Sequence, residues 1–295
     1  MIDDVKIKYK KKNMFLWTAV ILIMTVLLVG FSGCKSKKKV VLKPGEVTSA
    51  KDIYEKAKAR IKKDPEKARL LFKEIIHIYP DSTYAQRAKV GIADSYFRQK
   101  DAGSLIMAAN EYQEYVNLYP NSPDAVYAKY QAAMCYYKQQ RKPGRDQENT
   151  HKAIQAFESM VKMFPATEEA KDARQKIALA RQTLASHYYT IGHTNLWMGA
   201  VRGALARFKQ VIDEYPEFKS NDALFYNTGK AYFMMRDYDS ATSFFQRVIT
   251  DFPKSKFFKK SRKMLEKVAQ AKAKPSTIPP MKLDPTAKTE GAEKQ

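Results

Sequence analysis

Few side chains in this sequence have the type and the spacing that catalysis or metal binding requires. The four histidines are scattered, and the closest pair, His187 and His193, would lie on different faces of a helix. There is no glycine-rich phosphate loop, no G-x-S-x-G motif and no cysteine–histidine nucleophile pattern. We therefore expect neither enzymatic activity nor a metal ion, and we predict no cofactor.

Cys34 is the one residue whose surroundings suggest a covalent modification. It follows the small residues Ser32 and Gly33, after the uncharged apolar run Met14–Gly30 and before a lysine-rich stretch. Lysines also precede the apolar run, so residues 1–33 show the basic, apolar and small-residue regions of a secretory signal. We predict a signal peptide over residues 1–33 and a mature chain that begins at Cys34.

Three interpretations of this segment remain open. The apolar run is borderline for a transmembrane helix, which needs about 20 apolar residues, and a cleaved signal without lipid would leave a free thiol. Acylation of Cys34 explains both features, because residues 31–34 resemble a bacterial lipobox, with Phe31 where leucine is preferred. Aspartate after such a cysteine tends to retain a lipoprotein in the inner membrane. Lys35 stands there instead, so we predict a lipid-anchored protein on the periplasmic face of the outer membrane.

The chain is strongly basic, with a formal net charge of +22. Such a charge usually indicates nucleic acid, but a lipid-anchored protein outside the cytoplasm meets little of it, so we predict no nucleic-acid partner. Anionic lipid headgroups or an acidic protein are better candidates. The basic segment 254–267 is interpreted either as a solvated cap or as a contact with something acidic. Cys135 lies in an apolar stretch, which indicates a buried residue.

An internal repeat defines the expected fold. An aromatic–proline pair occurs five times, with alanine twelve residues and an aromatic eight residues before each proline. Alanine and aromatic share one helix face, where the small residue lets a neighbouring helix approach and the ring fills the adjacent gap. The proline then ends the helix. The five sets are Ala68–Phe72–Pro80, Ala108–Tyr112–Pro120, Ala153–Phe157–Pro165, Ala204–Phe208–Pro216 and Ala241–Phe245–Pro253.

The last set belongs to a complete tetratricopeptide-repeat pattern, a unit of about 34 residues that folds as two antiparallel helices. Its residues are Phe225, Gly229, Tyr232, Ala241, Phe245 and Pro253. We predict an all-α fold over residues 51–270, a right-handed superhelical array of five such helix pairs, each ending near one of the five prolines, plus a C-terminal capping helix. Residues 34–50 are predicted to be the lipidated N-terminus and a flexible linker, and residues 271–295 a disordered basic tail.

Parts of the array are similar to a known family. Residues 117–137 and 164–189, with the long first helix of repeat four that the second stretch implies, resemble the BamD family of tetratricopeptide-repeat lipoproteins of the outer-membrane β-barrel assembly machine. The resemblance implies a non-enzymatic lipoprotein that binds unfolded outer-membrane protein precursors. It would dock them to the barrel-forming subunit, alongside other lipoproteins of the machine. The loop 138–150 and the tail are not matched.

Two candidate binding sites follow. The segment from Leu184 to Pro216 has the same length as the corresponding segment of the family, so the two align without a gap. In that alignment Arg207 coincides with the family's interface arginine, and the resemblance therefore implies a docking contact there. The second site is a peptide-binding stripe on one helix face in repeat three. Its residues are Tyr127, Tyr130, Met134 and Tyr137. Rings with a polar end and an adaptable thioether suit the aromatic-rich terminal strand of a barrel precursor. Ordinary packing of the superhelix is the alternative, and both remain open.

Other binding functions are also compatible with a repeat lipoprotein. The chain could be a pilotin for a pilus secretin or a peptidoglycan-linked coordinator of the envelope. From a different class, it could be a structural anchor whose lysines contact acidic cell-wall polymers. Partners recovered from detergent-solubilised membranes would distinguish these alternatives.

Overall fold

The computed structural model describes residues 49–273, all of whose regular secondary structure is α-helical. The predicted signal peptide, Cys34, nearly all of the linker and most of the tail lie outside the described residues. Helix extends one residue before and three residues beyond the predicted 51–270. The helices are α2 (Ala50–Arg60), α3 (Pro65–Ile78), α4 (Thr83–Gln99), α5 (Ala102–Leu118), α6 (Ala125–Lys138), α7 (Glu148–Met163), α8 (Glu168–Trp197), α9 (Val201–Glu214), α10 (Asn221–Met234), α11 (Tyr238–Asp251) and α12 (Phe258–Ala273).

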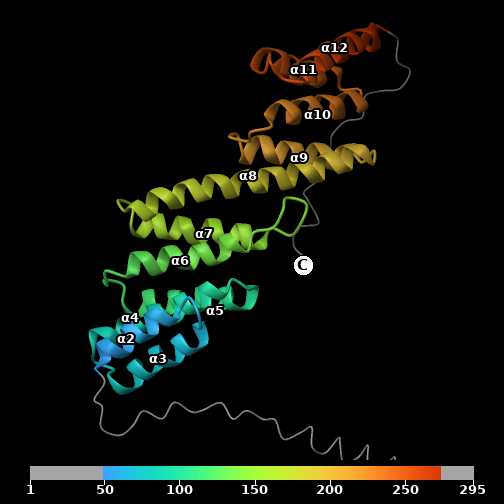
Figure 1. The fold of residues 1–295 in the computed structure, drawn as a ribbon. Helices are drawn as coiled ribbons and strands as arrows, with labels where there is room; N and C mark the ends of the chain where they lie inside the picture. The colour runs from blue at the N-terminus through green and yellow to red at the C-terminus, as the bar shows by residue number, and fades with distance from the viewer. Residues whose placement is uncertain (1–48, 274–295) are drawn as a thin grey trace, which may run out of the picture. The chain divides into compact units, whose positions relative to one another are not determined.

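The helices form a linear array in which each one packs against the next in the chain (Figure 1). Even-numbered helices α2 to α10 are the first helices of five pairs, and odd-numbered helices α3 to α11 are the second. The first helices of some neighbouring repeats also contact one another: α2 contacts α4, α6 contacts α8, and α8 contacts α10. Helix α12 packs on α11 after the last pair. The prediction of an all-α array of five tetratricopeptide-like pairs and a following helix is confirmed.

The aromatic–proline pairs end the second helix of every repeat. The aromatic caps the helix with φ between −133° and −128° and ψ between 57° and 60°, outside the helical region. Its backbone N–H still donates to the carbonyl four residues earlier. The cause is local, because the proline ring disfavours helical dihedrals in the preceding residue.

The core is built from the repeated alanine and aromatic residues. All ten are buried, with exposed fractions of at most 1%. Glycines on the facing first helices allow the rings to approach. A Cβ added to Gly229 would lie 2.8 Å from the Phe245 ring, and one added to Gly192 would lie 2.6 Å from Phe208. The tetratricopeptide glycine thus makes room for a ring, and the two helices pack more closely than larger residues would allow.

Helix α8 has 30 residues and is the longest of the described helices. Its first part packs on α7 and its later part on α9 (Figure 1). The α6–α7 loop, which could not be matched by sequence, reaches the same helix. The Nδ1 atom of His187 lies 2.6 Å from the carbonyl oxygen of Pro143. The loop is therefore held against α8.

Candidate peptide-binding and docking sites

The four stripe residues lie along one side of α6, as their spacing predicts, but in different environments. The rings of Tyr130 and Tyr137 each lie 5.9 Å from the ring of Phe157 on α7, and Met134 packs in the same cluster. These three side chains are half-buried, whereas Tyr127 is 38% exposed. The structure therefore gives three members of the stripe a packing role and leaves Tyr127 the most accessible.

Tyr127 connects repeat three to repeat two through a half-buried acid, Asp94. Its hydroxyl donates to Oδ1 of Asp94 on α4 at 2.9 Å, and the hydroxyl of Tyr112 donates to the same oxygen at 2.5 Å. The rings of Tyr112 and Tyr127 meet edge to face at 6.2 Å. Burial raises the pKa of the Asp94 carboxyl, because its desolvation outweighs the two tyrosine hydrogen bonds that favour the ionised form.

A second acid connects repeat three to repeat four. The hydroxyl of Tyr130 donates to Asp172 on α8. Lys176 pairs with the same carboxylate at 3.6 Å, and its ammonium lies 5.7 Å from the centre of the Tyr137 ring. The stripe thus runs between two carboxylates, Asp94 and Asp172. No sequence pattern indicates either acid, because they are 33 and 42 residues from their tyrosine partners.

We expect Asp94→Asn to change the pH dependence of stability. The pKa of Asp94 is raised in the folded protein, so the wild type should gain stability relative to the variant as pH falls from 7 through this raised pKa. This gain in stability is complete below about pH 4, the pKa of an aspartate in the unfolded chain. Urea denaturation of both proteins between pH 7 and pH 3.5 measures it.

Asp101→Asn is the matched control, because the pKa of Asp101 is lowered by hydrogen bonds from Ser104 at the start of α5. The wild type should lose stability relative to this variant as pH falls below about 4. A stability difference between wild type and Asp94→Asn that stays constant across the pH range would show that the Asp94 carboxyl is not perturbed.

Arg207 lies on α9 and is half-buried. Its guanidinium lies 5.7 Å from the centre of the Tyr188 ring, and Nη1 donates to Oε1 of Gln210 at 2.9 Å. Within residues 49–273 no carboxylate lies within ion-pair distance of it. The aromatic ring and the amide hold the cation in place and leave donors for an external acid.

Two large apolar side chains that the repeat pattern does not predict are exposed next to Arg207's helix, α9. Trp197 is 83% exposed and Met198 is 68% exposed at the turn between α8 and α9. Gly199 makes this turn with φ of +80°, a conformation that favours glycine. The sequence does contain a signal for this exposed pair, because two large apolar residues stand directly before a turn-forming glycine. Exposed tryptophan is common where protein surfaces meet.

The basic residues of segment 254–267 are all exposed. They lie on α12 or in the turn before it. Helix α12 buries only Ser261 and Val268, which is the burial pattern of an amphipathic helix with one covered side. Both interpretations of this segment, a solvated cap and a contact with something acidic, remain predictions.

Within residues 49–273 no helix is both long and apolar enough to cross a bilayer, and no group of three or more histidine, cysteine, aspartate or glutamate side chains is placed to hold a metal ion. Cys135 is buried, and this burial raises the pKa of its thiol to about 12. Asp94 and Asp172 are the two carboxylates described above that join neighbouring repeats.

These features define the class of protein, a tetratricopeptide-repeat scaffold, and the model of that repeat matches residues 222–255. The chain belongs to the YfiO family of outer membrane lipoproteins, whose model matches residues 46–237. In structure, it aligns with a thermophilic tetratricopeptide-repeat protein of Thermus thermophilus at 13% identity and a TM-score of 0.33, over 75% of this chain and 100% of the other.

Two curated relatives carry the same name. The chain is 39% identical over 71 residues to the outer membrane protein assembly factor BamD of Caulobacter vibrioides, and 29% identical over 113 residues to that of Rickettsia prowazekii. The alignments cover 24% and 38% of this chain, and 23% and 45% of the relatives. The chain thus matches less than half the length of each.

Proposed function

We propose that this protein is a non-enzymatic assembly factor that binds unfolded outer-membrane protein precursors and docks them to the barrel-forming subunit. A lipid on Cys34 would anchor it at the periplasmic face of the outer membrane, where other lipoproteins of the machine are its further partners. Membership in the outer membrane lipoprotein family and the names of the two relatives support this role.

One observation carries the precursor-binding part of the proposal. Tyr127 presents a partly exposed ring while its hydroxyl is held by Asp94, so the ring is fixed in orientation before any ligand arrives. A fixed ring loses little conformational entropy when a peptide packs on it. The neighbouring Tyr130 and Tyr137 extend the aromatic surface along the same side of α6.

The test is photo-crosslinking of a synthetic peptide, taken from the aromatic-rich terminal strand of a barrel protein, to the purified protein. Tyr127→Ser should weaken crosslinking several-fold, because this ring is the most exposed of the stripe, while circular dichroism should show that the variant stays folded. Double substitution of Tyr130 and Tyr137 is a poorer test, since both rings pack on Phe157 and their loss would also lower stability.

Tyr238→Ser is the matched control, because it makes the same chemical change on α11 in repeat five. It should leave crosslinking at the wild-type level. If Tyr127→Ser crosslinks as well as the wild type, the stripe has only a packing role.

A further inference from the structure

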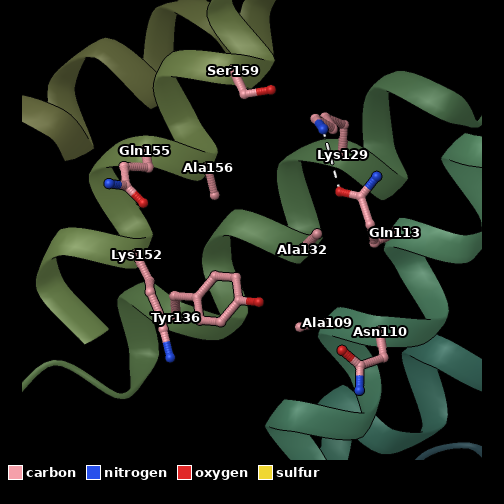
Figure 2. A pocket seen from close by; sticks show the side chains of 10 residues that line it. All are labelled: Ala109, Asn110, Gln113, Lys129, Ala132, Tyr136, Lys152, Gln155, Ala156 and Ser159. Carbon is pink, nitrogen blue, oxygen red and sulfur yellow. Dashed lines mark hydrogen bonds between the residues drawn. The ribbon is translucent and has the colours of Figure 1, made fainter. Parts of the chain in front are cut away.

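A groove lies between α5, α6 and α7, with a volume of about 360 Å³ (Figure 2). Its floor carries only methyl groups, from Ala109, Ala132 and Ala156, and the hydroxyl of Tyr136 points into it. At 100° per residue the α6 residues of the groove lie on the opposite side of that helix from the stripe described above. The groove is therefore distinct from the surface in the proposed function, and its interpretation does not depend on that function.

The groove exists because one repeat has a small residue where others have a large one. The residue after the repeated alanine is Arg69 in repeat one but Ala109 in repeat two. Arg69 places its guanidinium 4.1 Å from the centre of the Tyr96 ring and donates to Gln99 at 3.2 Å. Tyr136 in repeat three corresponds to Tyr96 in repeat two. The methyl group of Ala109 is too short to cover the Tyr136 ring.

The later repeats also fill this position. Ile154 and Leu205 follow the repeated alanine in repeats three and four, and both are buried in the cluster against which Tyr188 and Tyr232 pack. Among these four repeats, only repeat two has an alanine at this position. The small side chain is thus a feature of this one junction and not of the repeat.

The charge of the groove is positive. Lys129 is half-buried, and its ammonium contacts Oε1 of Gln113 at 3.3 Å (Figure 2). Within residues 49–273 it has no carboxylate within ion-pair distance. On the opposite wall Lys152 pairs with Glu148 at 2.6 Å. No acidic side chain lines the groove. A half-buried ammonium with only an amide partner favours an anionic ligand.

The neutral polar groups indicate what kind of anion fits. Asn110 and Gln113 line the groove from α5, and Gln155 lines it from α7. An amide side chain both donates and accepts hydrogen bonds, as a peptide backbone does. The alanine floor and the ring of Tyr136 suit apolar side-chain atoms. No arginine lines the groove, although arginine is the side chain best suited to bidentate phosphate recognition.

We propose that this groove binds an extended acidic segment of a partner polypeptide. The backbone of the segment lies over the alanine floor and pairs with the amides of α5 and α7. One of its carboxylates contacts Lys129, and one apolar or aromatic side chain covers Tyr136 as Arg69 covers Tyr96. The protein thus has a second polypeptide-binding surface, on the opposite side of α6 from the stripe.

The test uses a fluorescein-labelled peptide of eight residues with three glutamates, alternating alanines and a central phenylalanine, and an analogue with glutamine in place of glutamate. Fluorescence anisotropy with the purified protein should show tighter binding of the acidic peptide, weakening as salt is added. Lys129→Gln should weaken it about tenfold, the size expected for one charged hydrogen bond. Ala109→Arg should abolish binding, because the new side chain fills the space as Arg69 does.

Lys162→Gln is the matched control, because it removes the same charge from an exposed site on α7 outside the groove. It should bind as the wild type does, and circular dichroism should show that all variants fold. Equal affinity for the acidic and the glutamine peptide would overturn the proposal, as would wild-type binding by Lys129→Gln. Loss of binding with Lys162→Gln as well would show general attraction to a basic protein and would also overturn it.

Discussion

Replacing Phe157 with alanine is expected to lower the free energy of unfolding of repeat three by about 3–5 kcal/mol. The Phe157 side chain is fully buried, and it contacts the rings of Tyr130 and Tyr137 from the facing helix. Its removal leaves a cavity between α6 and α7 that the surrounding helices fill only in part. Because each repeat packs mainly on its neighbours, the loss should be concentrated in repeats two to four.

Amide hydrogen exchange measured along the chain tests this expectation, since it reports stability repeat by repeat. Protection should fall in α6 and α7 and stay close to wild type in α11. Leu70→Ala is the control, because Leu70 is 67% exposed and its truncation removes little buried area. Uniform loss of protection across all helices would show that the array unfolds as one cooperative unit, contrary to the prediction.

Arg207→Glu is expected to abolish co-purification of the barrel-forming subunit while folding is retained. The arginine is held by Tyr188 and Gln210 and lacks an acidic partner within the described chain, so a partner carboxylate can accept two parallel hydrogen bonds from it. Loss of one half of a desolvated charge pair costs about 2–5 kcal/mol at an interface. Charge reversal adds repulsion to that loss.

Two further variants test whether the effect is specific to the geometry and the position of Arg207. Arg207→Lys keeps the charge but cannot form the paired hydrogen bonds, so it should give an intermediate yield of the partner in pull-downs from detergent-solubilised membranes. Arg202→Glu makes the same charge change at an exposed position on α9 and should have no effect. Recovery of the partner at wild-type levels with Arg207→Glu would place the docking site elsewhere on repeats four and five. Recovery of a secretin or of cell-wall fragments with the wild type would favour the alternative functions.

The helix-pair array follows from local sequence patterns alone. The spacing of Ala153, Phe157 and Pro165, repeated in the other sets, requires only interactions along one helix and at its end. A ring four residues after an alanine shares its face, and a proline restricts the residue before it whatever the rest of the chain does. For the same reason the burial of the repeated aromatics was predictable. The sequence did not indicate which residues of the stripe on α6 would be packed and which exposed. A small rotation of the helix about its axis would bury an exposed side chain and expose a packed one.

The side chains that meet across repeats are set by the packing of helices from distant parts of the chain. Asp94 lies 33 residues before Tyr127, and Asp172 lies 42 residues after Tyr130, yet each pair shares a hydrogen bond. The open groove at Tyr136 likewise depends on the length of the side chain at position 109 in the preceding repeat. No periodic pattern encodes such contacts, because they depend on the rotation and separation of helices that are packed together from distant parts of the chain. The local repeat therefore fixes the scaffold, while the packing between repeats determines which surfaces remain available for partners.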